Sequence, residues 1–258
     1  MALYGFCNLA LIPMRKSASH RSEMVSQLLF GEAYEILEQA SQWTYIKTTF
    51  DCYKGYIDRN QVALMREEEY IQAYQTQTPL YAQARTLLVD KRRNFSFHIP
   101  PGSSLPLYAE NHIRLGAEHF EISQIYPAKS LEEILLAYIN TPYLWGGRSP
   151  LGIDCSGFTQ ITYKTLGIDL LRDASQQVKQ GKDIVYLNQS RKGDLAFFQN
   201  DKGLITHTGI LIDSQHIIHA SAKVRIDRVD EKGIFNLENE EYSHKLHRIK
   251  RISPPIHT

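Results

Sequence analysis

The sequence predicts an α+β protein in which a β-rich half precedes a domain of helices and strands. Apolar residues recur at nearly every second position in 34–39 and 43–50, the period of a half-buried strand. After residue 155 they recur at helical spacing, and three strand-like runs follow at 193–198, 206–212 and 216–221. The 258 residues carry a net charge of only +1, so no general attraction to nucleic acid or membranes is expected.

Residues 1–66 are expected to form the first domain. A Gly31-Glu32 turn, a strand over 43–47 and a closing strand over 55–57 follow one another in this order. The order and spacing resemble a small bacterial SH3-like β-barrel. An unspecified β-sheet domain is the alternative reading.

Residues 67–128 are expected to form a second SH3-like barrel or a linker region. A charged helix is predicted over 67–75, a turn at 100–102, and short strands over 113–116 and 119–122. Ser130 and Glu133 then have the spacing of a capping box that opens a helix over 131–140. The third domain is therefore expected over 129–258.

The three cysteines, Cys7, Cys52 and Cys155, are widely spaced and odd in number. This pattern predicts neither a disulfide framework nor a zinc motif, and three free thiols fit a reducing compartment. The first residues lack the basic segment and small-residue cleavage site of a secretion signal, and no apolar run approaches the ~20 residues of a membrane span. A cytoplasmic location is expected.

Cys155 is the candidate nucleophile. A loop containing Gly146, Gly147 and Gly152 precedes it, and a helical pattern follows it, so the cysteine is expected at a helix N-terminus. The partial positive charge there favours thiolate and is expected to lower the pKa of the thiol below its usual ~8.5. A buried, inert cysteine is the alternative.

Two histidines follow on strands predicted to be neighbours, His207 in 206–212 and His219 in 216–221. Residues on adjacent strands whose faces agree can hydrogen-bond side by side. A thiolate, an imidazole that takes its proton and a second group that orients the imidazole are the minimum for acyl transfer by cysteine. Alternatively, each histidine is an ordinary sheet residue, or both join Cys155 as zinc ligands.

Five segments in order, YLWGG, GIDCSGF, GDLAFF, THTGILI and IIHAS, resemble the NlpC/P60 family of cell-wall peptidases over residues 130–258. The resemblance implies a papain-like α+β core with helices on an antiparallel sheet. It implies that Cys155 is the nucleophile, His207 the general base and His219 the group that orients it. Tyr143 would help to polarise the scissile carbonyl. The reaction would pass through a thioester acyl-enzyme and need no cofactor or metal.

The combination with SH3-like barrels resembles γ-D-glutamyl-L-diamino-acid endopeptidases, which cut murein peptides that carry a free N-terminal L-Ala. The resemblance implies that Asp154 binds the ammonium of this L-Ala. From the first barrel, Glu23 and Tyr53 would complete the ammonium pocket, with Tyr56 as a competing match. Trp145 and Ser156 would line the γ-D-Glu pocket, and Ser175 would bind the α-carboxylate.

Other functions stay open from the sequence. They are an amidase or acyltransferase of the same fold, a non-catalytic protein that binds wall peptides, and the zinc hydrolase described above. The expected partner is a murein peptide, with no nucleic acid and no membrane, and a monomer is expected. The charged residues of 223–258 are expected on solvated faces, and a last strand is expected near the end of this segment. No functional role is expected for His244, His247 and His257.

Overall fold

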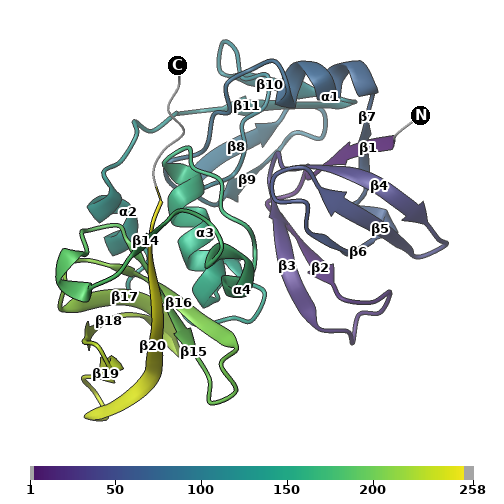
Figure 1. Cartoon of the computed structure of the whole chain (residues 1–258). Coiled ribbons are helices and arrows are strands. Elements are labelled where there is room, and N and C mark those ends of the chain that lie inside the picture. Colours follow the sequence, from purple (N-terminus) through teal and green to yellow (C-terminus); the bar gives the residue numbers. More distant parts are fainter. Residues whose placement is uncertain (1–2, 253–258) are drawn as a thin grey trace. The chain divides into compact units, whose positions relative to one another are not determined.

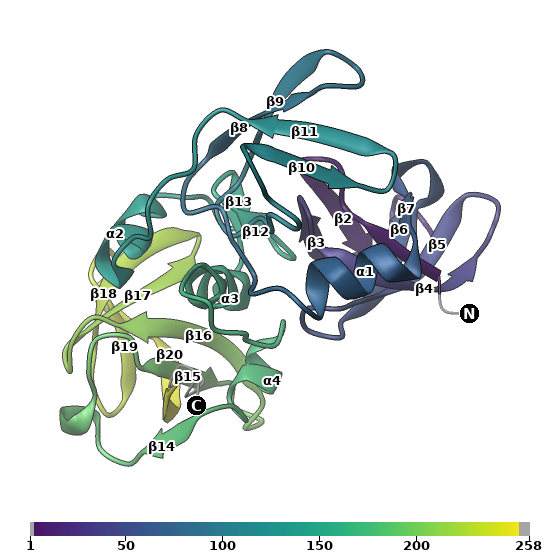
Figure 2. The same ribbon diagram turned by 90° about the horizontal axis from the view of Figure 1, so that it is seen from above.

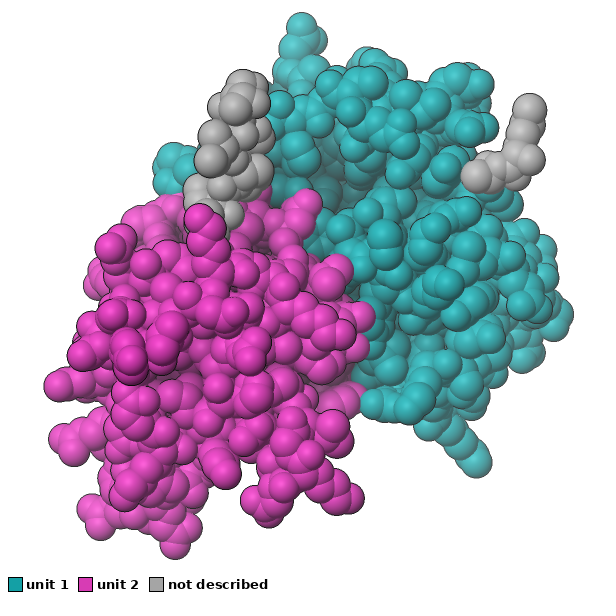
Figure 3. Space-filling model, viewed as in Figure 1, with its two compact units in different colours: residues 1–128 teal, residues 129–258 magenta. Residues whose placement is uncertain are grey.

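The computed structural model describes residues 3–252, which divide into two compact units at residues 128 and 129. Figure 3 colours the two units separately, and Figure 1 labels their elements. No described helix is long and apolar enough to cross a membrane.

The first unit begins with a seven-stranded antiparallel sheet in the order β3-β2-β6-β5-β4-β1-β7. Its strands are β1 (Leu3–Phe6), β2 (Leu11–Arg15), β3 (Met24–Leu29), β4 (Ala33–Gln39), β5 (Trp43–Thr48), β6 (Lys54–Asp58) and β7 (Ala63–Met65), with a short 3-10 helix, η1 (Arg59–Gln61), between the last two. In β5 and β6 buried and half-buried residues alternate as the sequence predicts. Ile12, Ile46 and Ile57 lie in the apolar core that this alternation produces.

The rest of the first unit contains helix α1 (Glu67–Tyr74) and a second antiparallel sheet in the order β10-β11-β8-β9. These strands are β8 (Thr86–Asp90), β9 (Phe95–Ile99), β10 (His112–Leu115) and β11 (Glu118–Ile122). Phe30, which follows β3, packs among the core residues of this second sheet. Phe6 and Met65 of the first sheet share another apolar cluster with Ala73 and Leu115. The two sheets of the unit therefore share buried side chains.

The second unit is built on a closed antiparallel sheet. Its order is β14-β20-β15-β16-β17-β18-β19, and β20 also pairs with β19, so six strands close into a barrel to which β14 adds an edge. The strands are β14 (Lys182–Ile184), β15 (Leu195–Gln199), β16 (Ile205–Leu211), β17 (His216–Ser221), β18 (Lys223–Val229), β19 (Gly233–Asn236) and β20 (Glu241–Arg251). Register shifts in β15–β20 and β19–β20 pairing supply the bends that closure requires.

Helices pack against this sheet, as the predicted α+β fold requires. They are α2 (Leu131–Ala137), α3 (Cys155–Thr165), α4 (Ala174–Gln177) and the 3-10 turn η2 (Leu187–Gln189). All residues of α3 are buried, and the helix lies beside β16 (Figures 1 and 2). The predicted capping box at the start of α2 is confirmed, because Ser130 accepts from the Glu133 N–H and Glu133 accepts from the Ser130 N–H. A small hairpin of β12 (Arg148–Ser149) and β13 (Gly152–Ile153) leads into α3.

The reading of residues 223–258 as solvated faces is wrong for part of that segment. Residues 223–229 form β18, and within it Asp227 is fully buried and Arg225 nearly so. The two charged side chains alternate with exposed residues and share the inward face of a strand. They are buried together because they form an ion pair, which composition alone does not reveal.

Candidate active site

Cys155 is the first residue of α3, as predicted, and its side chain is almost completely buried. The loop before it is compact: a Cβ on Gly147 would lie 2.4 Å from the Gly152 carbonyl oxygen, so only glycine fits. Asp154 caps the helix by accepting from the Gly157 N–H at 2.7 Å. The backbone N–H of Cys155 belongs to the first turn, whose amides have no acceptor within the helix.

The sulfur of Cys155 lies against β16. The backbone N–H of Thr208 donates to it, and this residue follows the predicted base, His207, directly in the chain. Both Cys155 and His207 are buried, and α3, which begins with the thiol, packs against β16, which carries the imidazole.

The expectation of a low thiol pKa is wrong. Burial raises the pKa of Cys155 to about 12, and the negative charge of Asp154 raises it further, whereas the N–H groups of Thr208 and Ser156 and the charge of Arg172 act in the opposite direction. Burial also lowers the pKa of His207 well below its usual value. Desolvation therefore outweighs the helix dipole here, and both groups favour their neutral forms without substrate.

The two histidines are neighbours, as their strands predict. In β16 and β17, Gly209 lies opposite His219, and Nε2 of His207 lies 2.8 Å from Nδ1 of His219. The other ring nitrogen of His219, Nε2, lies 3.0 Å from a carboxylate oxygen of Asp227. His207, His219 and Asp227 thus form a continuous hydrogen-bonded chain across β16, β17 and β18.

Asp227 was missed by the sequence reasoning. It lies on β18, and its other carboxylate oxygen accepts from Arg225 at 2.9 Å and from the Leu237 N–H at 3.0 Å. Burial alone would raise its pKa, but the hydrogen bonds from His219, Arg225 and Leu237 lower the pKa to about 2. The signal available in the sequence was the alternation of KVRIDRV, which places Arg225 and Asp227 on one face of a strand.

His244 is not incidental to the histidine pair, contrary to the prediction from the sequence, because it contacts His207 directly. Its ring stacks on that of His207, with centroids 4.0 Å apart and planes 25° apart, and Phe198 packs against both rings. Burial lowers the pKa of His244 to about 4, so at neutral pH it presents a neutral ring to His207. His247 is exposed, and His257 lies outside the described residues.

Tyr143 is held next to the nucleophile by backbone contacts. It bridges to Ile153, two residues before Cys155, and its N–H donates to the Ala222 carbonyl at 2.8 Å. Burial raises the pKa of the Tyr143 hydroxyl, and negative charge on Cys155 and Asp154 raises it further. The phenol therefore stays protonated at neutral pH and can donate a hydrogen bond.

The predicted pocket residues of the second unit differ in exposure. Trp145 is 60% exposed, Ser175 is exposed on α4, and Ser156 is buried. Ser156 accepts a hydrogen bond from Arg172 at 2.9 Å. Their roles toward a substrate stay predictions.

The carboxylate of Asp154 is already heavily engaged. It accepts from the N–H groups of Gly146 and Gly157, and Arg172 donates to both of its oxygens. Arg172 is only 1% exposed, so this is a buried, bidentate ion pair at the start of α3. The prediction that Asp154 binds an ammonium stays a prediction, and the negative charge of this carboxylate is balanced by the guanidinium.

The predicted residues of the first unit have local partners there. Glu23 is exposed and accepts from Lys16 at 3.1 Å. Tyr53 is half-buried against the core of the first sheet, and Tyr56 packs against Tyr45 with ring centroids 4.7 Å apart. Their proposed contact with an ammonium stays a prediction.

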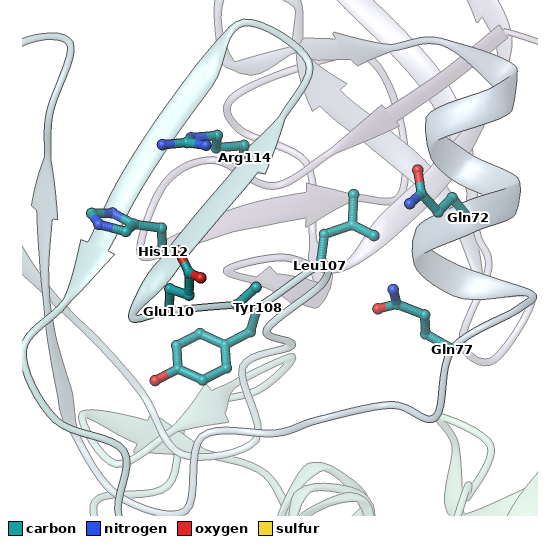
Figure 4. Close-up of a pocket in the computed structure, with 8 residues that line it drawn as sticks. Gln72, Gln77, Leu107, Tyr108, Glu110, His112 and Arg114 are labelled. Atoms are coloured by element: carbon teal, nitrogen blue, oxygen red, sulfur yellow. The ribbon is translucent and has the colours of Figure 1, made fainter.

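Two cavities lie away from these groups. One, of about 350 Å³ in the first unit, is lined by polar side chains that include Gln72, Gln77, Glu110 and Arg114 (Figure 4). The other, of about 410 Å³, is lined by residues of β14 and β20 in the second unit. Neither lining includes a residue of the predicted site.

The zinc alternative requires several ligands to converge on one ion. Among residues 3–252, no group of three or more His, Cys, Asp and Glu side chains has a geometry that could hold a metal ion. Both ring nitrogens of His219 instead face His207 and Asp227. This is the arrangement of a hydrogen-bonded relay.

A cysteine that begins a helix, with a histidine pair on the antiparallel sheet beside it, defines the papain-like class of α+β folds. Residues 140–242 match the NlpC/P60 family, and residues 14–62 match the bacterial dipeptidyl-peptidase SH3 domain. The chain therefore carries a domain of the NlpC/P60 peptidase family together with a bacterial SH3 domain.

Relatives and solved structures agree with this assignment. The chain is 27% identical to dipeptidyl-peptidase 6 of Lysinibacillus sphaericus, over 82% of this chain and 86% of that protein. It is 40% identical to the γ-D-glutamyl-L-lysine dipeptidyl-peptidase of Bacillus subtilis, over 32% of this chain and 28% of that one. An NlpC/P60 family protein from Bacillus cereus shares the fold, with a TM-score of 0.78 at 19% identity over 97% of this chain and 100% of that one.

Proposed function

We propose that this protein is a cysteine endopeptidase that hydrolyses the γ-D-glutamyl-L-diamino acid bond of murein peptides with a free N-terminal L-Ala. The observation that carries the chemistry is the relay from His207 to Asp227 on the sheet against which α3, with Cys155 at its start, packs. The relative named γ-D-glutamyl-L-lysine dipeptidyl-peptidase supports the choice of bond. The three free thiols fit the further proposal that it acts in the cytoplasm, as a monomer, on murein fragments.

In the proposed first step, His207 removes the proton from Cys155 as the sulfur attacks the amide carbonyl. Because burial disfavours both charged forms, the proton transfer is coupled to the attack rather than completed beforehand. The negative charge that develops on the carbonyl oxygen is met by the first N–H groups of α3, and Tyr143 donates from its phenol.

In the second step, protonated His207 gives its proton to the leaving amine, and a thioester forms on Cys155. Water then attacks the thioester with His207 acting again as general base, and the acyl product leaves with its new carboxylate. His219 stays hydrogen-bonded to His207 through both steps, and the buried Asp227 stabilises the positive charge that the histidines carry between them.

The proposed preference for a free amine rests on the family resemblance of Asp154, Glu23 and Tyr53. A desolvated ammonium needs a carboxylate, and loss of one partner of such a pair costs about 2 to 5 kcal/mol. Arg172 already pairs with Asp154, and Lys16 pairs with Glu23. The proposed pocket therefore needs both carboxylates, Asp154 and Glu23, to balance the ammonium together with these two cations.

The experiment incubates the protein with L-Ala-γ-D-Glu-L-Lys and with the meso-diaminopimelate tripeptide, each with and without N-acetylation, and identifies products by mass spectrometry. We expect cleavage that releases the diamino acid only from peptides with a free amine. Cleavage of acetylated peptides would remove the ammonium pocket from the proposal. Release at a different amide would favour an amidase, and product with a new amine attached would favour an acyltransferase.

Cysteine variants test the nucleophile. Cys155→Ala should abolish turnover, because Cys155 is the proposed nucleophile and the other two cysteines belong to the first unit. Cys52→Ser, which changes an exposed thiol of the first unit, is the matched control and should keep both the turnover of the wild type and its inhibition by iodoacetamide. Peptide binding by the wild type without any turnover would point instead to a non-catalytic binding protein.

A further inference from the structure

The chain of hydrogen bonds that ends at Asp227 has a definite direction. A carboxylate can only accept, so Nε2 of His219, 3.0 Å from Asp227, carries the proton. In a neutral His219 the Nδ1 atom is then an acceptor, and the Nε2 atom of His207, 2.8 Å away, is the donor. Neutral His207 therefore keeps its lone pair on Nδ1.

We infer that Asp227 is a positioning residue that selects the tautomers of both histidines, so that His207 offers Nδ1 as the base for Cys155. This inference deepens the proposed function and depends on it for its catalytic meaning. Without the carboxylate, His219 can instead place its proton on Nδ1 and donate to His207. The lone pair of His207 would then point at His219, and the base would be lost.

The surroundings of Asp227 hold it in the acceptor role. Arg225 contacts both carboxylate oxygens, through Nε at 2.7 Å and a terminal nitrogen at 2.9 Å, and the Leu237 N–H supports one of them. Arg225 also donates to Glu238 at 2.7 Å. Glu238 also pairs with Lys223 at 3.0 Å, so the charges of the wider cluster balance. Asp227 is the carboxylate of this cluster that lies directly against His219, and its negative charge favours a positive charge on the histidines during proton transfer.

His244 and the proposed nucleophile, Cys155, carry no competing charge at neutral pH. His244, on β20, stacks on His207, and burial lowers its pKa to about 4. Cys155, on α3, has its pKa raised by burial, so it is a neutral thiol until attack. Asp227 is thus the charged group of the described residues whose hydrogen bond reaches the histidine pair directly.

The first test observes the tautomers without using a substrate. In protein labelled with 15N-histidine, the ring nitrogen shifts should identify His207 and His219 as protonated at Nε2 and unprotonated at Nδ1. Asp227→Asn should lose this single tautomer pattern. The asparagine side chain has one oxygen and one NH2 group, and its NH2 group must face either His219 or Arg225 and Leu237, all of which are themselves donors. A wild-type His219 protonated at Nδ1, or an unchanged pattern in Asp227→Asn, would overturn the inference.

The second test measures catalysis on the tripeptide substrate. Asp227→Asn should lower kcat by about a hundred- to ten-thousand-fold, the range for loss of a correctly presented base, with little change in KM. Asp227→Glu, which retains an acceptor, should recover part of the loss. The matched control is Asp213→Asn, since exposed Asp213 also pairs with a histidine, His216, on the same sheet, and its activity should be unchanged.

The two tests separate the inference from the function on which it rests. A wild type that cleaves no murein peptide but has the expected tautomers would contradict the proposed function and support the role of Asp227. An active wild type whose Asp227→Asn variant keeps kcat within about threefold would contradict the role of Asp227 alone. If the variant does not fold, the wild-type nitrogen shifts decide.

Discussion

Replacing Arg172 by methionine tests whether the buried ion pair at the start of α3 holds the nucleophile in place. Arg172 is 1% exposed and donates to both oxygens of Asp154 and to Ser156. Methionine retains much of the volume but removes the charge, so the carboxylate next to Cys155 is left buried without its counter-charge.

The expected loss of stability follows from this burial. Removing one partner of a buried pair costs about 3 to 5 kcal/mol, a large part of the ~5–15 kcal/mol by which domains are stable. Hydrogen exchange measured by mass spectrometry on core strands β15 and β16 reports the second unit alone. Their protection should fall by roughly two to four orders of magnitude in Arg172→Met.

Two further variants control this result. Arg248→Met removes an exposed arginine of the same unit, 3.7 Å from Asp183, and should cost less than about 1 kcal/mol. Asp154→Asn combined with Arg172→Met removes both buried charges while keeping a helix cap, and should recover much of the loss. If Arg172→Met costs no more than Arg248→Met, the reasoning about the buried pair is refuted.

Three other predictions use different parts of the second unit. Gly209→Ala should lower kcat roughly tenfold or more in the tripeptide assay, because the new Cβ would lie 2.8 Å from Cβ of His219 and displace it; unchanged kinetics would show that the strand adapts. Ser130→Ala removes the cap of α2 and should lower the free energy of unfolding by about 1 kcal/mol, as measured by urea unfolding monitored through hydrogen exchange. An unchanged free energy of unfolding would contradict the capping role. The pKa of Asp227, about 2 in the fold against ~3.9 unfolded, contributes about 2 to 3 kcal/mol above pH ~4 that is lost as pH falls toward 2. Asp227→Asn should lack that acid-dependent loss, and parallel acid curves for the two proteins would contradict it.

Local patterns were enough to place most elements of the site. The glycine-rich loop and the helical spacing after it put Cys155 at the start of α3, and the capping pair at Ser130 marked α2. Period-two alternation put His207 and His219 on neighbouring strands, which the 2.8 Å contact confirms. These predictions succeeded because backbone propensity and side-chain periodicity act over a few residues.

Long-range partners were not predictable in this way. Arg172 lies 18 residues from Asp154 in the sequence, and nothing local to either marks them as a buried pair. His244 reaches His207 only because β20 closes the barrel between β15 and β19. A run of charged residues predicts a solvated surface, because charged side chains are seldom buried without a partner and the sequence does not show the partner.

The sequence by itself determined the chemical inventory of this protein: a sulfur before a helix, two imidazoles on strands, and the family to which their spacing belongs. The tertiary structure decided how those groups ionise. Burial between α3 and β16 raises the thiol pKa against the helix dipole, and closure of the barrel brings Asp227 behind the histidines. Ionisation depends on desolvation and on neighbours across strands, and both are properties of the packed fold rather than of any segment.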